Sequence, residues 1–525
     1  MNGTPGSGAV ATCEATALQP RRTALDAMAT LRVGSLDLGK IVVAFCLTFA
    51  VADWFSAIRA PLWLDETNSY WSIAGGFWRI WSRQGLSFPA YSYILWLTAR
   101  LFGSSEVVLR LPSVAAMLAA VYVLYRIARE FFEADIAWIV TLIFCVQPAV
   151  SFAAVDARPY ACGVLVTNCA ILMLLRFIKT NARRDAVLFG VYTAGIFYFH
   201  YLFGVVVAAF LLVVFVRSGR EWKRVCSKLA VALVPFALMM LVAFSHLVYL
   251  VETRQSHVYT LAPTPDEFLQ TVIPANLGVV FLAAVVAATV IGRLRTPEGE
   301  PSKTAETCLI LGIVPLGILY SVSVFTPIHV FLPRYRLVAL SGVALCWGFL
   351  ISRIGARSLR IALCVALMLC TFHELPCSIW RDHGYSWKEA LQVADANVAS
   401  DHAPLLIASG LVESNSAPLP TDVINSPMFS PLSYYKVHGP VVALPRDLTP
   451  AAQAQVNKFL SNAVPARQRF VVLVHGGVEH NLNVWIENAA QDYYTANVVG
   501  AFDDVVVTEY VPRDGSPLRF VPRSE

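Results

Sequence analysis

Residues 60–70 read APLWLDETNSY, and they lie between a long apolar run and a segment rich in aromatic residues. This stretch carries two adjacent carboxylates, Asp65 and Glu66. A carboxylate at the edge of a membrane is suited to proton transfer when its surroundings are apolar. The alternative is that Asp65 caps a short helix, since Asp side chains accept hydrogen bonds from free helical amides. The rest of the chain has to decide between these two roles.

The composition is that of a membrane protein. Of the 525 residues, 57% are hydrophobic and only 14% are charged, whereas about 25% are charged in a typical soluble domain. The mean hydropathy is +0.60. The net charge of +5 is small, and no nucleic-acid partner is expected. The 11 cysteines show no CxxC or zinc-like Cys/His spacing, and they are interpreted as small packing residues.

The apolar runs predict a polytopic α-helical membrane protein with about 11 transmembrane helices. The predicted spans are residues 38–57, 107–128, 135–154, 160–178, 186–200, 202–216, 228–250, 273–291, 305–325, 336–352 and 359–375. With the leading tail inside, the inner segments hold 21 of the 40 Lys and Arg residues, and the outer loops between spans hold nine. Cytoplasmic loops are enriched in Lys and Arg. The N-terminus is therefore predicted to be cytoplasmic.

The spans divide the chain into three predicted regions. Residues 1–36 are small, polar and unpatterned, which indicates a disordered cytoplasmic tail. Residues 37–375 form the transmembrane module, and residues 376–525 lie on the extracytoplasmic side. In this last region runs such as PLLIA at 404–408 and FVVLV at 470–474 predict strands, and 385–398 and 450–460 predict helices. We expect a small α/β domain there.

The stretch FPAYSYILWLTARLF, at residues 88–102, is short for a transmembrane span and has Arg100 near its end. It is predicted to be an interfacial helix on the outer face, with its aromatic side chains at headgroup depth. The first outer loop, residues 58–106, then becomes a long structured element. Loops of this length are usually functional or disordered, and this one is too aromatic for disorder.

Ionisable and tyrosine side chains recur where the predicted spans reach the outer face. Those singled out are Arg110, Arg158, Tyr160, His200, Tyr201, Arg334, Tyr335 and Arg336. Each has an ordinary explanation, because Arg and His snorkel to headgroups and Tyr belongs to the interfacial aromatic belt. Together they place guanidiniums and an imidazole on the face that carries Asp65. Ionisable groups at a membrane boundary are functional candidates by default.

An ordered set of motifs resembles GT-C membrane glycosyltransferases, in the bacterial branch related to protein O-mannosyltransferases and aminoarabinose transferases. The motifs are LDE at 64–66, LFG at 101–103, EVVLRLP at 106–112, DARPY at 156–160, FHY at 199–201, PRY at 333–335 and YSWKEA at 385–390. The resemblance covers residues 38–375 well and the outer domain loosely. It implies a GT-C-like fold and sugar transfer from a polyprenyl-phosphate sugar at the outer face of a bacterial inner membrane. The acceptor would be a glycolipid, a polysaccharide or a protein.

The resemblance also implies roles for the acidic pair. Asp65 corresponds to the carboxylate proposed as the base that deprotonates the acceptor hydroxyl, and Glu66 would orient the acceptor or neighbouring groups, or share that role. In some relatives the pair instead binds acceptor or a metal.

Chemistry suggests the partners of the donor phosphate. Guanidinium forks match phosphate oxygens, which makes Arg158, Arg334 and Arg336 candidate ligands, and His200 would add a hydrogen bond. Arg110, Tyr160, Tyr201 and Tyr335 are secondary candidates. A divalent cation is allowed but not demanded, since no compact His/Asp ligand cluster is seen.

Two other classes of protein remain as alternatives. A transporter usually has polar sites at the bilayer midplane between repeated halves, and this sequence shows neither feature. A non-catalytic envelope scaffold would tolerate Asp65→Asn and Arg158→Ala together, whereas an enzyme would not.

Overall fold

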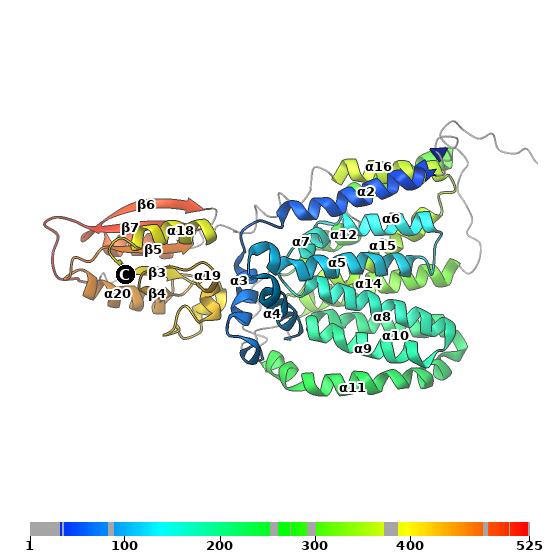
Figure 1. Ribbon diagram of the computed structural model, residues 1–525, viewed down its shortest axis with the longest axis horizontal. Coiled ribbons are helices and arrows are strands. Elements are labelled where there is room, and N and C mark those ends of the chain that lie inside the picture. Colours follow the sequence, from blue (N-terminus) through cyan, green and yellow to red (C-terminus); the bar gives the residue numbers. More distant parts are fainter. Residues whose placement is uncertain are drawn as a thin grey trace, which may run out of the picture.

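The computed structural model describes residues 32–33, 36–81, 89–252, 261–273, 275–290, 301–371, 387–475, 481–502 and 505–522. The predictions for residues 1–31 of the tail and for residues 376–386 lie outside the described residues. Figure 1 shows two parts, a bundle of long helices and a smaller sheet domain beside one end of that bundle. A short antiparallel strand pair, β1 (Arg32–Val33) with β2 (Leu36–Asp37), precedes the first long helix.

The bundle helices follow the predicted apolar runs. Their bounds are α2 Leu38–Trp54, α5 Glu106–Ala128, α6 Ala134–Cys145, α7 Pro148–Ala154, α8 Tyr160–Thr180, α9 Arg183–Phe199, α10 Val206–Ser218, α11 Trp222–Glu252, α12 Pro265–Val272, α13 Ala275–Val290, α14 Pro301–Phe325, α15 Pro333–Ser352 and α16 Arg357–Thr371. This arrangement is that of a multi-pass membrane protein. Among the described residues, seven helices are long and apolar enough to cross a membrane, or up to nine if each of two bent helix pairs is one span.

Two of the predicted spans correspond to helices that are not among those long enough to cross a membrane. α9 has 17 residues, and α16 has 15 described residues. The count of 11 spans therefore stays a prediction, although each predicted stretch coincides with a helix or a helix pair.

The predicted span 135–154 is broken into α6 and α7, which meet at an angle of 76°. Pro148 is at the start of α7. Proline lacks an N–H, so it begins a helix more readily than it continues one. The break leaves α7 near the chain turn at residues 155–159, which carries the DARPY motif.

Glycines bring α14 and α15 into close contact. A Cβ on Gly342 would lie 2.3 Å from the backbone carbon of Leu311, and one on Gly312 would lie 2.9 Å from the backbone nitrogen of Val343. Small residues allow membrane helices to approach closely. This contact fixes α15, whose first turn carries Arg334.

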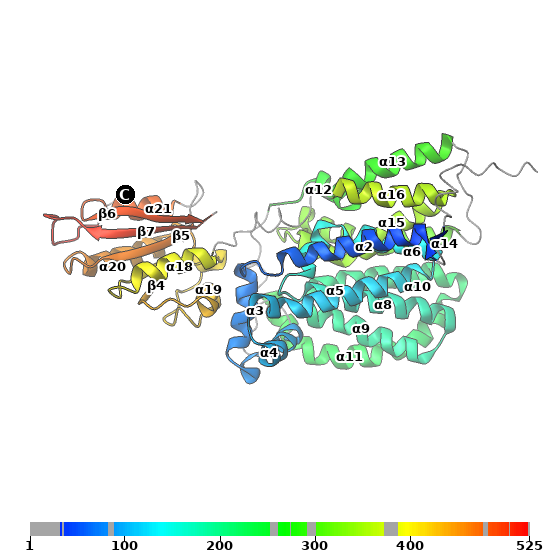
Figure 2. The same cartoon turned by 45° about the horizontal axis from the view of Figure 1, so that its top comes forward.

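Two helices of the first outer loop lie across the end of the bundle nearest the sheet domain, as both views show (Figures 1 and 2). They are α3, Leu64–Ala74, and α4, Ala90–Phe102. α4 is the helix predicted from the aromatic stretch at 88–102.

The C-terminal domain is built on a five-stranded sheet in the order β4-β3-β5-β7-β6. β3 is parallel to β4 and β5, and the remaining pairs are antiparallel. The elements are α18 Trp387–Val398, β3 Leu405–Ala408, α19 Ser430–Tyr434, β4 Val441–Leu444, α20 Pro450–Ala463, β5 Phe470–His475, α21 Leu482–Ala490, β6 Tyr494–Phe502 and β7 Val505–Pro512. The predicted α/β character of this region is confirmed.

Candidate functional site

The site is built on the first turn of α3, which begins at Leu64. The backbone N–H of Trp63, just before the helix, donates to Glu66 Oε2 at 3.3 Å. Glu66 therefore provides the local cap that was considered for Asp65. A carboxylate in the first turn also interacts favourably with the positive end of the helix dipole.

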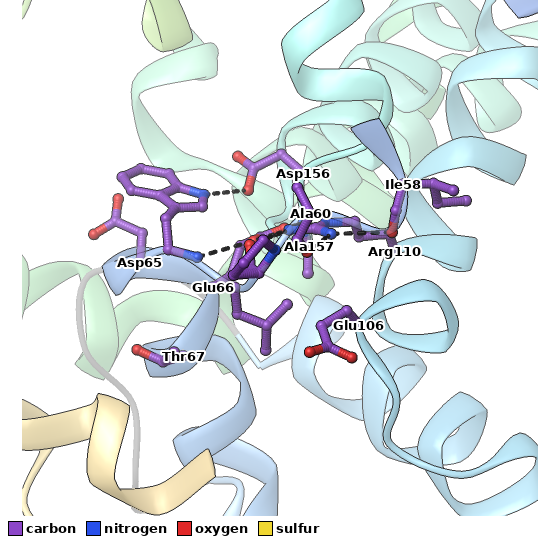
Figure 3. Close-up of polar contacts among 12 residues, drawn as sticks. Ile58, Ala60, Asp65, Glu66, Thr67, Glu106, Arg110, Asp156 and Ala157 are labelled. Carbon is purple, nitrogen blue, oxygen red and sulfur yellow. Dashed lines mark hydrogen bonds and ion pairs between the residues drawn. The ribbon is translucent and has the colours of Figure 1, made fainter. Parts of the chain in front are cut away.

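Glu66 and Arg110 form a buried ion pair (Figure 3). Arg110 Nε donates to Glu66 Oε1 at 2.8 Å and Nη2 donates to Oε2 at 2.5 Å. Both side chains are 0% exposed. Glu66 thus has no access to a substrate, and this geometry fits the orienting role predicted for it rather than direct contact with an acceptor.

Arg110 holds the chain segment that leads into α3. Its Nη1 donates to the carbonyl oxygens of Ile58 at 3.0 Å and Ala60 at 2.6 Å, and its Nη2 donates to that of Pro61 at 2.9 Å. Together with the two bonds to Glu66, all five N–H donors of the guanidinium are in use. Arg110 is therefore a structural anchor, and a ligand would have to displace these bonds to reach it.

The DARPY turn is tied to the same network. The N–H of Ala157 donates to Glu66 Oε1 at 2.8 Å, and Trp63 Nε1 donates to Asp156 Oδ1 at 3.0 Å (Figure 3). Asp156 is fully buried, and its Oδ2 has no hydrogen-bond partner among the described residues. Burial, and then the negative charge of Glu66, raises the pKa of the Asp156 carboxyl well above its usual range.

Asp65 meets two arginines from distant parts of the chain. Its Oδ2 lies 3.2 Å from Arg334 Nη1 and 3.9 Å from Arg158 Nη2. Arg158 Nη1 also donates to the backbone carbonyl of Asp65 at 3.0 Å and to Ser69 Oγ at 3.3 Å. The side chains of Asp65, Arg158 and Arg334 are 19%, 17% and 25% exposed, so all three are open to a ligand.

A cluster of rings adjoins these arginines. The His200 ring centroid lies 5.4, 5.5, 5.1 and 5.0 Å from those of Tyr160, Tyr201, Phe203 and Tyr335. The Arg158 guanidinium lies over Tyr160, and that of Arg334 lies over Tyr335. His200 is 6% exposed, and its Nδ1 has no partner within the part of the chain that the structure describes. The structure thus brings the predicted histidine and tyrosines to the arginines.

Arg336 is the exception, and the prediction that it binds the donor phosphate does not fit the structure. Its Nη1 donates to the Glu267 carbonyl oxygen at 3.2 Å and to Thr271 Oγ1 at 2.5 Å, and its guanidinium lies over Phe331. Side chains two positions apart on an α-helix point in directions that differ by about 200° around the helix axis. Because Arg334 points to Asp65, Arg336 is directed to α12 instead.

Comparisons with known proteins identify the fold of the chain. Residues 87–249 match the family model described as dolichyl-phosphate-mannose-protein mannosyltransferase. The chain is similar to the crystal structure of ArnT from Cupriavidus metallidurans bound to undecaprenyl phosphate, with a TM-score of 0.56 and 13% identity over 89% of this chain and 97% of ArnT. For the crystal structure of ArnT from the same organism in the apo state, the TM-score is 0.58 and the identity is 14%, over 90% of this chain and 98% of ArnT. The fold is that of a GT-C glycosyltransferase. No curated protein sequence matches the chain.

The resemblance seen in the sequence is thereby confirmed at the level of the GT-C fold. The family match covers Arg110, Arg158, Tyr160, His200 and Tyr201. Asp65 and Arg334 lie outside it, and they join the site through the contacts of the folded chain.

In this GT-C fold, sequence reasoning missed several residues that hold the site together. Trp63 reaches Asp156, and Ser69 accepts from Arg158. Ser113 donates through its Oγ to the Arg158 carbonyl oxygen at 3.2 Å. Ser113 lies three residues after Arg110 on α5, and this helical spacing is the one signal that points to it.

Among the described residues, no group of three or more His, Cys, Asp or Glu side chains is arranged to hold a metal ion. Glu66 and Asp156 are fully buried in their own network.

Proposed function

We propose that this protein transfers a sugar from a polyprenyl-phosphate-linked donor to an envelope acceptor at the outer face of a bacterial inner membrane. One observation carries the proposal: an accessible carboxylate, Asp65, and two accessible guanidiniums, Arg158 and Arg334, meet at one end of a GT-C bundle. The excess of Lys and Arg in the inner segments supports an extracytoplasmic position for that end.

The chemistry is a single displacement at the anomeric carbon. Asp65 accepts the proton of the acceptor hydroxyl, whose oxygen forms the new bond to that carbon. The bond from the carbon to the phosphate oxygen breaks, and the phosphate keeps the electron pair. Direct attack from the opposite side inverts the anomeric configuration.

Arg158 and Arg334 act on the leaving group. Negative charge builds up on the phosphate as the glycosidic bond breaks, so cations placed there stabilise the transition state more than the bound donor. His200, beside both arginines, offers a ring nitrogen to a phosphate oxygen. Glu66 and Arg110 keep the segment before Asp65 in place.

ArnT, whose fold this chain shares, was crystallised with undecaprenyl phosphate, and this lipid phosphate is our choice of donor carrier. A glycolipid, a polysaccharide or a protein serves as acceptor. A transporter would have its polar site at the bilayer midplane, whereas Asp65, Arg158 and Arg334 gather beside α3 at the end of the bundle.

The test uses the full-length protein in vesicles. Undecaprenyl phosphate carrying radiolabelled sugars is supplied with envelope fractions as acceptors, and transfer of label from the lipid is measured. We expect transfer by the wild type and about a 100-fold or greater loss in Asp65→Asn, since general base catalysis contributes typically 10²–10⁴-fold. Asp266→Asn, at an exposed position on α12, keeps the wild-type rate. The proposal fails if label never leaves the lipid, or if Asp65→Asn transfers as fast as the wild type.

A further inference from the structure

Helix α3 lies between the two parts of the molecule, and its opposite faces serve them separately. Leu64, Thr67 and Trp71 recur at helical spacing and share one face. Thr67 Oγ1 lies 3.0 Å from Ser430 Oγ, and Trp71 Nε1 donates to the Asn425 carbonyl oxygen at 2.9 Å. This face of α3 contacts the C-terminal domain.

The other face of α3 contacts the helix bundle. Asp65, Glu66 and Ser69 lie on it and contact Arg334, Arg110 and Arg158, respectively. A displacement of α3 by the C-terminal domain therefore moves the Asp65 carboxylate relative to both arginines of the site.

Leu64 is seated at a particular place in the C-terminal domain. The sheet order puts β4 on one side of β3 and β5 on the other, so the chain continues from the parallel strands β3 and β5 toward opposite edges of the sheet. In α/β sheets the crevice at the carboxyl ends of such strands is the usual ligand position. Here Leu64 packs against the core of the C-terminal domain, beside Gly410, which follows β3, and near Trp387 at the start of α18.

Gly410 makes room for Leu64. A Cβ on Gly410 would lie 2.6 and 2.7 Å from the two methyl carbons of Leu64, and 3.1 Å from Trp387 Cζ2. The two distances to Leu64 are too short for a real contact, so a side chain at position 410 requires the Leu64 side chain to shift. Asp65 is the next residue along the chain.

A second contact holds the segment two residues earlier. The N–H of Leu62 donates to the Tyr435 hydroxyl at 2.7 Å. Leu62 and Leu64 are thus both held by the C-terminal domain, immediately before the carboxylate.

We propose that the C-terminal domain sets the position of Asp65, and that Leu64, Gly410 and Tyr435 are positioning residues for sugar transfer. The inference rests on the proposed function. Displacing a reacting group by about 1 Å can cost about 10²-fold in rate, so small changes at these contacts are expected to act on kcat. They leave the affinity for the lipid phosphate unchanged, because Arg158 is held in the turn between α7 and α8 and Arg334 in the first turn of α15.

A double-mutant cycle tests this pair of residues. Gly410→Ala is expected to lower kcat about 10-fold or more in the Leu64 background. In the Leu64→Ala background, where the colliding methyl groups are gone, the same change is expected to cost less than about twofold. Gly439→Ala is the matched control. Gly439 lies just before β4, and a Cβ there would lie 2.9 Å from the Ala403 carbonyl oxygen. For this variant, kcat per folded molecule is expected to be unchanged.

Two further measurements separate the possible failures. The unfolding temperatures of the same four proteins report whether Leu64 and Gly410 are in contact, whatever the activity. Equilibrium binding of undecaprenyl phosphate reports the donor site. Coupling in unfolding temperature without coupling in kcat overturns the positioning role, and no coupling in either overturns the contact itself. A wild type that transfers no sugar refutes the proposed function instead, while the unfolding data still report on the contact.

Discussion

The pair Arg334 and Arg336 offers the sharpest prediction for donor binding. Both are arginines in the first turn of α15, two positions apart, but only Arg334 reaches Asp65, at 3.2 Å. Replacing it by Ala removes a charged hydrogen bond to the donor phosphate, which is worth about 1.5–3 kcal/mol. That range corresponds to roughly 10–150-fold in Kd. Because the side chain is 25% exposed, solvent screening favours the lower end, and we expect about 10-fold.

The assay is equilibrium binding of undecaprenyl phosphate to purified protein at fixed ionic strength, since exposed charges are screened by salt. Arg336→Ala is the control. It removes the same charge from the same helix turn, but its guanidinium is bound to Glu267 and Thr271 on α12, so Kd is expected to stay within about twofold. Equal losses in the two variants would show that general positive charge, and not the geometry at Asp65, attracts the lipid phosphate. Unchanged binding in Arg334→Ala would refute the assignment outright.

Three further predictions concern the groups around Asp65. Glu66→Gln leaves the Arg110 guanidinium buried without a counter-charge, and we expect a loss of about 3–5 kcal/mol in unfolding free energy; Glu130→Gln, in an exposed ion pair, should lose less than about 1 kcal/mol. The pKa of Asp156 is raised by burial, so the folded state holds its proton to higher pH than the unfolded chain, and stability falls as pH rises above the normal value of 3.8. Asp156→Asn should remove that part of the pH dependence in thermal unfolding scans from pH 4 upwards, and an unaltered slope would contradict the raised pKa. His200→Phe keeps the ring contacts and removes the ring nitrogens. We expect a near-normal unfolding temperature and a Kd for undecaprenyl phosphate that is about 3–10-fold weaker, because a hydrogen bond worth about 0.5–1.5 kcal/mol is lost. A large drop in stability with normal binding would show that the role of His200 is purely structural.

The sequence was sufficient to predict the membrane fold, since long apolar runs and the Lys/Arg distribution act locally and are visible in a single chain. It also predicted that Asp65, Arg158, His200 and Arg334 would meet, because each follows or precedes a span on the same face. It did not reveal the break between α6 and α7, although Pro148 inside the apolar run was a signal for it.

The separate fates of neighbouring residues were harder to predict. Asp65 and Glu66 are adjacent, yet a helix turns by about 100° per residue, so one carboxylate is accessible and the other is buried against Arg110. The same rotation separates Arg334 from Arg336. Such differences follow from helix phase, which the sequence shows only once the helix start is known.

Contacts with the C-terminal domain were beyond the reach of the sequence. Thr67 and Ser430 are separated by 363 positions, and neither shows a periodicity or a motif that points to the other. Lys388, within the YSWKEA motif, also joins the two parts, since its Nζ lies 3.0 Å from Glu106 Oε1 on α5. Leu64 and Gly410 carried no chemical signal at all, because their contact depends only on shape.

The two-sided use of α3 has a consequence for exchanging parts between relatives of this fold. In a chimera that joins this bundle to a foreign C-terminal domain, Leu64 has no space to pack unless the new domain has a glycine just after its first sheet strand, as Gly410 is here. It also needs a hydroxyl to accept the Leu62 N–H. Grafts that transplant α3 together with its own sheet domain should keep their activity, while grafts cut between the two should not.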